Sequence, residues 1–423
     1  MMTAAAQRTG PLELDRSPHA RLTPLALDDA AIAGGLWADR KQINRQVLLP
    51  EAVGHLEDAG NFGNLRAAAG RSDEPYRGMV FADSDVYKWL EAIGWELARR
   101  PDDHLARSAD TTIELIADAQ YDDGYLNSYY QVAQPGWSNL THDHELYCAG
   151  HLIQAAVAQS RGRGDHHLLT VARRFVDLIE TVFTGDRRPS TPGHPEIEMA
   201  LVELYRLTRE PRHLALAEHF VDQRGHGQLR SGHFGSSYFQ DHIPVREATE
   251  VAGHAVRALY LAAGVTDIYL ETSEPQLLEA IRAQWHDMAA RKSYVTGGLG
   301  AHHQDEAFGD PYELPPDRCY GETCAAIASI MWNWRMLLVT GDARHADLIE
   351  RTLYNGFLVG LALDGRGFSY VNPLQVRDQH RDPVERGALR QPWYECACCP
   401  PNVMRLLASL DDYLATTDDS GSS

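Results

Sequence analysis

The sequence predicts an all-α fold, an (α/α)6 toroid with short loop hairpins, and three observations support this prediction. From about residue 84, apolar residues recur at spacings of three and four within segments of helical length. These segments are mostly paired and are separated by short polar or glycine-containing breaks. Signals for strands are few and short. Helical hairpins of similar length suit a ring that closes on itself, whereas an open helical array, the alternative, would need caps on two apolar ends.

The expected helices, about eleven in all, follow one another along the chain. Those of the first half cover residues 86–97, 106–119, 144–160, 168–182, 195–207 and 214–221. Those of the second half cover residues 254–263, 276–290, 325–339, 346–361 and 402–414. Residues 293–296 and 367–371 favour strands beside glycine-rich turns, so we expect loop hairpins there.

The length of 423 residues exceeds the usual size of one simple hydrophobic core, which a large closed architecture accommodates. Residues 1–80 are rich in Ala, Gly, Pro and charge and lack strong periodicity, which predicts an irregular N-terminal arm. Residues 81–415 are expected to form the toroid. Residues 416–423 are acidic and rich in Ser and Gly, so we expect a disordered tail or a truncation point.

The composition indicates a folded protein and argues against two classes of partner. Hydrophobic residues make up 44% and charged residues 23%, which is ordinary for a globular protein. A net charge of -20 would repel nucleic acid and anionic membrane surfaces, so neither is expected to bind. The first residues have no apolar core typical of a signal peptide, and no segment approaches the roughly 20 apolar residues of a membrane span. We expect a soluble, cytoplasmic protein.

Six cysteines occur, and four of them lie in two short motifs that each precede an expected helix. The first motif is ETC at 322–324, and the second is CACCPPN at 396–402. The double proline of the second motif fixes where the chain turns into the helix, because proline is favoured in a first helical turn. In a reducing compartment, grouped cysteines are more often metal ligands or catalysts than disulfide partners.

The residues of the two motifs suit one metal ion. Glu322 and Cys324 are two positions apart, so they share one face of an extended segment. Two of the three late cysteines complete a set of one carboxylate and three thiolates, which suits tetrahedral zinc. A small buried hydrophobe is the alternative interpretation for Cys324 and Cys148, but three cysteines within four residues are harder to explain in that way. A purely structural zinc site remains the competing hypothesis.

The residues at 320–325 and 396–402 resemble the signature of glycoside hydrolase family 127, the β-L-arabinofuranosidases. Further matches lie at 144–151, 193–198 and 253–257, in the order of the family. The resemblance implies an (α/α)6 barrel, a zinc site of one glutamate and three cysteines, and retention of anomeric configuration. Members usually continue into β-sandwich domains, which we expect to be lacking because this chain ends soon after its last helix.

The resemblance also implies roles for single residues. The zinc ligands would be Glu322, Cys324, Cys398 and Cys399. Cys398 would attack the anomeric carbon, and Glu306 would be the acid/base. A free thiol is mostly protonated at neutral pH, and zinc would hold it as the reactive thiolate.

Further positions match residues that contact the sugar in the family: His144, His194, His254 and Tyr370. Weaker candidates, expected to pack around the pocket or beside the metal, are His142, His151, Tyr320, Trp393 and Cys396.

The predicted function is a retaining glycoside hydrolase that removes terminal β-L-arabinofuranosyl residues from oligosaccharides or glycans. Its partner would be a small oligosaccharide or glycoside, and a homodimer is possible. Two alternatives stay open: a related zinc glycosidase for another sugar, and a noncatalytic carbohydrate-binding toroid with a structural zinc site.

Overall fold

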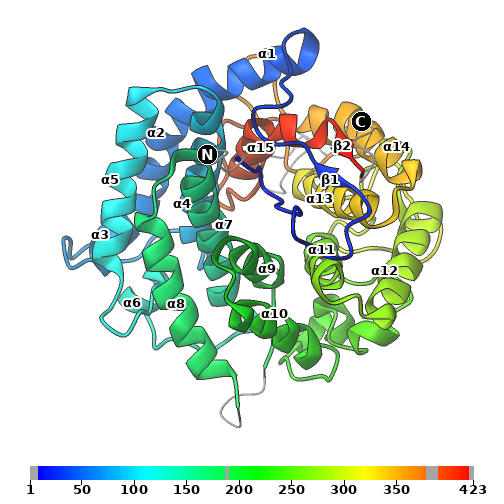
Figure 1. Ribbon diagram of the computed structural model, residues 1–423, viewed down its shortest axis with the longest axis horizontal. Helices are drawn as coiled ribbons and strands as arrows, with labels where there is room; N and C mark the ends of the chain where they lie inside the picture. The colour runs from blue at the N-terminus through cyan, green and yellow to red at the C-terminus, as the bar shows by residue number, and fades with distance from the viewer. Residues whose placement is uncertain (1–7, 186–189, 378–388, 419–423) are drawn as a thin grey trace, which may run out of the picture.

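The computed structural model describes residues 8–185, 190–377 and 389–418, and this part of the chain is mostly helical. Six helices form an inner ring (Figure 1): α4 (Asp83–Arg99), α7 (Glu145–Arg163), α9 (Ile197–Thr208), α11 (Ala255–Thr272), α13 (Thr323–Thr340) and α15 (Cys399–Ala408). Each packs against the next in this order, and α15 packs against α4, which closes the ring. The predicted all-α toroid is therefore confirmed.

Outer helices cover the ring, each following an inner helix in the sequence (Figure 1): α5 (Asp103–Ala119), α8 (His167–Phe183), α10 (Pro211–Gln223), α12 (Pro275–Asp287) and α14 (Ala343–Arg351). Outer helices such as α8 bury one apolar stripe, whereas α4 and α13 are buried on nearly all sides, as a ring inside a ring requires. Every expected helix overlaps an observed one.

The N-terminal segment differs from the prediction. Residues 35–68, expected to be irregular, form α1 (Gly35–Ile43), the π-helix η1 (Asn44–Leu48), α2 (Leu49–Ala59) and α3 (Asn61–Ala68). The segment 35–59 packs against α15 and α4, so it takes the sixth outer place in the toroid instead of forming a separate arm. Pro50 lies within this helical segment, in the first turn of α2. The wider turn of η1 just before it tolerates a residue that has no N–H donor.

Strands are minimal in the described residues. β1 (Thr23–Pro24) pairs antiparallel with β2 (Thr416–Thr417). The prediction of a disordered tail is thus wrong for 416–417, and residues 419–423 lie outside the described part. Around 367–371, Phe368 bridges to Leu361 and Gln391, whereas 293–296 forms a turn closed by Tyr294 and Gly298 instead of a strand. The remaining short helices are α6 (Ser128–Val132), η2 (Gly232–Phe234), η3 (Ser236–Phe239), η4 (Val245–Glu247), η5 (Met288–Lys292), η6 (Thr352–Phe357), η7 (Leu358–Gly360) and η10 (Leu410–Tyr413).

Two glycines let the inner helices α4 and α7 approach closely. A Cβ atom on Gly162 would lie 2.4 Å from the backbone oxygen of Gly94, and a Cβ on Gly94 would lie 2.8 Å from the carbonyl carbon of Ala158. Both contacts are far inside van der Waals distance, and both involve backbone that cannot turn aside. Glycine at these two positions is therefore a packing requirement.

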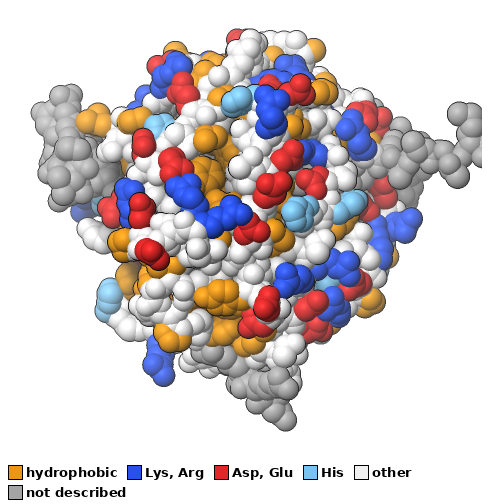
Figure 2. Space-filling model, turned by 90° about the vertical axis from the view of Figure 1, so that its left-hand side faces the viewer, with side chains coloured by type: hydrophobic (Ala, Val, Ile, Leu, Met, Phe, Trp, Pro, Cys, Tyr) orange, Lys and Arg blue, Asp and Glu red, His pale blue; other side chains and the backbone are white. Residues whose placement is uncertain are grey.

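The surface around α5 and α3 carries both signs of charge. Figure 2 shows acidic and basic side chains intermixed there. Arg66 pairs with Glu57 and Arg71 pairs with Asp118 among the exposed groups. None of the helices in the described ranges has both the length and the apolar composition of a bilayer crossing.

The inner helices begin at one common end of the ring. His144, His254, Glu322 and Cys398 are the residues that immediately precede α7, α11, α13 and α15. Side chains from the beginnings of several inner helices line one cavity, which places the candidate site at this end.

Candidate active site

A cavity of about 220 Å³ opens at the beginnings of the inner helices. It is lined by all but one of the residues predicted to form the site: His144, His194, His254, Glu306, Glu322, Cys324, Tyr370 and Cys398. The exception, Cys399, is fully buried and contacts Cys324 and Cys398 from beneath.

Three thiols and one carboxylate form a tight cluster. Cys324 Sγ lies 3.5 Å from Cys398 Sγ and 3.3 Å from Cys399 Sγ. Cys398 Sγ and Cys399 Sγ are 3.9 Å apart, and Glu322 Oε1 lies 3.6 Å and 3.9 Å from them. Sulfurs bound at about 2.3 Å to one tetrahedral zinc are about 3.8 Å apart. The cluster therefore has the size and donor set of a metal site, and the buried Glu322 Oε2, without a hydrogen-bond partner in the described chain, fits the same purpose.

Two helix beginnings converge on this cluster. Glu322 immediately precedes α13 in an extended conformation, and Cys324 lies in its first turn. Cys398 immediately precedes α15 and Cys399 is its first residue, with Pro400 in the first turn as predicted. The unpaired N–H groups of a helix beginning carry partial positive charge, which favours anionic thiolate and carboxylate groups.

Burial makes it costly for the cluster to be charged. It raises the pKa of Glu322 well above its ordinary value, and the negative charge of Cys398 adds to this. It likewise raises the pKa of the Cys399 thiol. Burial also opposes ionisation of Cys324, but hydrogen bonds with Cys398 and Cys399 outweigh it and lower the pKa to about 7. Four acidic groups this close need a cation if all are to be ionised together.

Tyr370 contacts the sulfur of Cys398 from the cavity wall. Its hydroxyl lies 3.0 Å from Cys398 Sγ and 3.4 Å from Cys396 Sγ. Burial raises the pKa of Tyr370 well above its ordinary value, so the hydroxyl stays protonated and can donate to a thiolate. Cys396 lines the cavity but lies outside the four-residue cluster.

Glu306 projects from the loop before α13 and is held by two donors. His254 Nε2 lies 2.9 Å from Glu306 Oε2, and the hydroxyl of Tyr320 donates to Oε1 at 3.0 Å. His254 Nδ1 accepts the N–H of Val256, which caps α11. Burial lowers the pKa of His254, so the ring is neutral and its remaining proton is on Nε2, facing Glu306. Glu306 itself has a φ of 60°, a left-handed conformation that is uncommon outside glycine.

Three histidine rings stand side by side along the cavity. His194 lies 5.5 Å from His144 and 5.8 Å from His254 between ring centroids. Burial lowers the pKa of His194 well below its ordinary value and that of His144 to about 3. The rings are therefore neutral at pH 7. The Nδ1 atom of His194 donates to Pro195 O at 2.8 Å, which leaves Nε2 as an acceptor for a ligand hydroxyl.

The weaker candidates are distributed around this site. Tyr320 contacts Glu306, as described, and His142 packs on Phe239 with centroids 5.5 Å apart. His151 lies beneath the cavity, with Nδ1 3.2 Å from Glu196 Oε1. Trp393 is not among the lining residues and stacks on His55 with ring centroids 4.8 Å apart.

Arg257 and Asn402 are among the lining residues that the sequence interpretation did not name as site residues. The buried Arg257 donates to Gly193 O at 3.0 Å and lies over the ring of Tyr238, 5.0 Å from its centroid. Asn402 donates from Nδ2 to Cys324 Sγ at 3.1 Å. Arg257 follows His254 by three positions, so helical spacing places the two on one side of α11, but its contact with Gly193 has no local signal.

Comparisons with known proteins place the chain in a family. The family model described as "Beta-L-arabinofuranosidase, GH127 catalytic domain" matches residues 30–412, a range that includes the N-terminal helices of the toroid. The non-reducing end β-L-arabinofuranosidase of Bifidobacterium longum subsp. longum is 38% identical over 385 residues, which cover 85% of this chain and 58% of that protein. The chain thus spans less than two thirds of the length of this relative.

Solved structures give the same result. A GH127 β-L-arabinofuranosidase from Geobacillus stearothermophilus T6 has a TM-score of 0.88 and 40% identity, covering 91% of this chain and 65% of that one. The cellobiose 2-epimerase of Bacillus thermoamylovorans B4167 has a TM-score of 0.54 and 11% identity, covering 81% of this chain and 94% of that one, and shares the fold alone. From the family match over residues 30–412 and the likeness to solved GH127 structures, we conclude that the chain belongs to the GH127 β-L-arabinofuranosidase catalytic-domain family.

Proposed function

We propose that the chain is the catalytic part of a retaining glycoside hydrolase that removes terminal β-L-arabinofuranosyl residues from oligosaccharides or glycans. The observation that carries the proposal is that the Cys398 thiol, the Glu306 carboxyl group and three neutral histidines line one cavity. A nucleophile and a proton donor at one cavity are what a retaining hydrolase requires. The sugar is inferred from the similar proteins, which are named as β-L-arabinofuranosidases.

The residues that would hold Zn²⁺ are Glu322, Cys324, Cys398 and Cys399, whose ligand atoms all lie within 4.8 Å of one another. When bound, the metal would supply positive charge that keeps the buried thiols in the thiolate form at neutral pH. The soft sulfur donors favour zinc over magnesium or calcium.

In the first step, Cys398 Sγ attacks the anomeric carbon, forming a C–S bond while the glycosidic C–O bond breaks. Glu306 donates a proton to the leaving oxygen. In the second step, Glu306 accepts a proton from water, the water oxygen attacks the anomeric carbon, and the C–S bond breaks to return the thiolate. Each step inverts the configuration at the anomeric carbon, so the two steps together retain it. The Tyr370 hydroxyl lies 3.0 Å from the sulfur and would donate to the departing thiolate and stabilise it.

The size of the cavity supports action on a single terminal sugar. Its volume of about 220 Å³ is below the roughly 300–1,000 Å³ of pockets that hold drug-sized ligands. The ring nitrogens of His144, His194 and His254 are neutral and can exchange hydrogen bonds with sugar hydroxyls without desolvating a charge.

The test is hydrolysis of a panel of p-nitrophenyl pentosides, with and without a zinc chelator. We expect hydrolysis of the β-L-arabinofuranoside, loss of activity on chelation, and recovery on adding Zn²⁺. Hydrolysis of another pentoside alone would contradict the proposed sugar. Activity that survives complete metal removal would contradict the role of zinc.

Variants separate a catalytic site from a structural zinc site. Cys398→Ser is expected to abolish hydrolysis, whereas Cys319→Ser, a buried thiol outside the cavity, is expected to preserve it. Metal content of each variant is measured in parallel. Full hydrolysis of every pentoside by Cys398→Ser would rule out the nucleophile.

A further inference from the structure

The side chain of Asn402 lies between the thiol cluster and a buried arginine. Its Nδ2 donates to Cys324 Sγ at 3.1 Å, and its Oδ1 accepts from Arg405 Nε at 2.7 Å. An arginine nitrogen can only donate, so the amide oxygen must face Arg405 and the NH₂ group must face the sulfur. Asn402 is 1% exposed, which shields this arrangement from bulk water. The amide orientation is thus determined by its neighbours.

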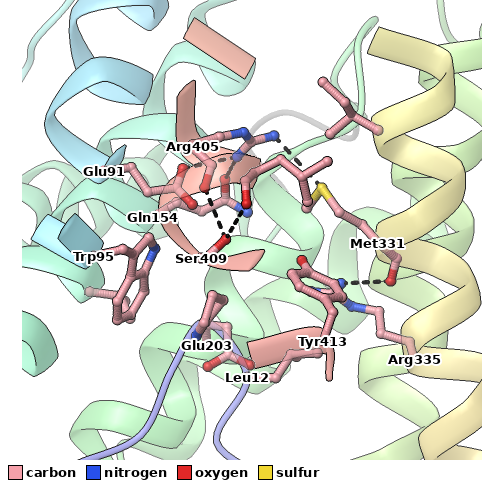
Figure 3. Close-up of a pocket in the computed structure, with 14 residues that line it drawn as sticks. Leu12, Glu91, Trp95, Gln154, Glu203, Met331, Arg335, Arg405, Ser409 and Tyr413 are labelled. Carbon is pink, nitrogen blue, oxygen red and sulfur yellow. Dashed lines mark hydrogen bonds and ion pairs between the residues drawn. The ribbon is translucent and has the colours of Figure 1, made fainter. Parts of the chain in front are cut away.

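Arg405 is itself held from several sides of the ring. Its Nη1 donates to Glu91 Oε2 at 2.9 Å and to Gln154, and its Nη2 donates to the hydroxyl of Tyr260 at 2.8 Å. These partners stand on α4, α7 and α11. Figure 3 shows Arg405 with Glu91 and Gln154. These residues line a cavity of about 30 Å³. The guanidinium group therefore has little freedom to move.

The helix α15 joins this network to the site. Asn402 and Arg405 are three positions apart, so they are neighbours on one face of α15. The same helix carries Cys399 as its first residue, while Cys324 stands on α13. A line of contacts thus runs from the interior of the ring, through Arg405 and Asn402, to one sulfur of the cluster.

We propose that Asn402 is a positioning residue that presents an N–H donor to the Cys324 thiolate, and that Arg405 fixes its amide for this purpose. The proposal rests on the zinc site of the proposed function. An N–H donor stabilises a thiolate and draws electron density from it, and partners behind a ligand tune the metal. Cys324 receives its donor from the rigid interior, whereas Cys398 receives the Tyr370 hydroxyl at the cavity wall. This difference in donors would distinguish Cys324, a permanent metal ligand, from Cys398, the reactive thiolate.

The test uses the full chain loaded with Co²⁺, whose sulfur-to-metal charge-transfer absorption reports on the thiolates. Asn402→Leu keeps a similar volume and removes the donor. We expect its charge-transfer band to move to lower energy, because the sulfur lone pairs lose a stabilising hydrogen bond. In chelator competition, zinc binding is expected to weaken about 10-fold to 100-fold.

Two arginine variants distinguish positioning from packing. Arg405→Lys keeps a positive charge near Glu91 but removes the Nε donor, so we expect a smaller shift in the same direction. Arg335→Lys is the matched control, because Arg335 is equally buried, lines the same small cavity and donates from Nε to Asp267 at 2.6 Å. It is expected to lose stability but to keep the spectrum of the unaltered chain.

Each outcome has a distinct meaning. If Asn402→Leu kept the charge-transfer band and the zinc affinity of the unaltered chain, this inference would be overturned and the proposed zinc site would stand. A shift in Arg335→Lys as large as in Arg405→Lys would overturn the positioning role, since packing would then explain both. Absence of any cobalt–thiolate band in the unaltered chain would overturn both the zinc site of the proposed function and this inference.

Discussion

At the scale of single residues, His254 links the architecture to the chemistry. Its Nδ1 accepts the N–H of Val256 and so caps α11, while its Nε2 lies 2.9 Å from Glu306 Oε2. One ring thereby sets its own tautomer and holds the carboxyl group that is proposed to transfer protons. The strained backbone of Glu306 is maintained by the same contact and by the hydrogen bond between Ala255 N and Glu306 O.

Glu306→Gln tests the proton-transfer role. The amide cannot donate or accept the proton, so kcat for an oligosaccharide is expected to fall about 10²-fold to 10⁴-fold. With a p-nitrophenyl glycoside, the rate of the first step, cleavage of the glycosidic bond, should fall less, because this leaving group needs little protonation. Glu313→Gln, on the exposed part of the same loop, is the control. Equal losses for both substrates in Glu306→Gln would contradict the assignment.

Local sequence motifs predicted the residues of the thiol cluster. They did not predict the residues whose place in the site depends on contacts between distant segments. Glu322 and Cys324 were recognised because their spacing brings two donors to one ion. Asn402 and Arg257 were missed as site residues, because their roles depend on contacts with Cys324 on α13 and with Gly193 before α9. Such contacts arise only when the ring closes, and no local spacing encodes them.

At the scale of secondary-structure elements, helical periodicity predicted the toroid, because buried faces of helices repeat at three and four residues. It failed at residues 35–68. There Pro50, which has no backbone N–H, lies within a helical segment. The wider turn of the π-helix η1 accommodates the absent N–H donor, so the chain stays helical. Composition favoured an irregular arm, but packing against α15 and α4 stabilises these helices.

Gly162→Ala tests the close approach of α4 and α7. The new Cβ would meet Gly94 O at 2.4 Å, so the helices must move apart, and we expect a loss of about 1–3 kcal/mol in unfolding free energy. Gly54→Ala on α2 is the control, because nothing lies within 4 Å of its Cβ position. Alanine there should stabilise by up to about 1 kcal/mol. Urea denaturation measures both, and a neutral Gly162→Ala would contradict the packing argument.

His345 on α14 predicts a pH dependence of stability. Burial against Trp285 lowers the pKa of His345 to about 4 from its ordinary 6.5. Between these values the unfolded chain binds a proton that the folded chain does not, so stability is full above pH 6.5 and falls as the pH drops toward 4. The loss is up to about 3 kcal/mol. His345→Leu should flatten the decline between pH 7 and pH 5 in urea denaturation; an unchanged slope would contradict this assignment.

At the scale of the whole molecule, the two motifs of the thiol cluster belong to α13 and α15, adjacent inner helices that are separated in the sequence by residues 341–398. A metal ion held by both motifs would therefore tie together two segments of the ring. The three histidines and Glu306 stand in the segments that precede the inner helices, so integrity of the toroid and integrity of the site are linked.

Metal removal is accordingly expected to lower the melting temperature. With free zinc about 100-fold above its dissociation constant, binding stabilises the folded chain by about 2.7 kcal/mol. Chelation should remove this amount, and Zn²⁺ but not Mg²⁺ should restore it. Calorimetry with metal analysis measures the effect. An unchanged melting temperature after verified metal loss would show that the ion does not bridge the two helices.

The most direct test of the central claim is to locate the covalent bond of the trapped intermediate. The zinc-loaded chain is quenched with acid during turnover of an activated β-L-arabinofuranoside, digested and analysed by tandem mass spectrometry. We predict that one pentosyl group is attached to Cys398, and that Cys398→Ser carries none. A pentosyl group on Glu322 or Glu306, or rapid turnover with Cys398 always unmodified, would contradict the account.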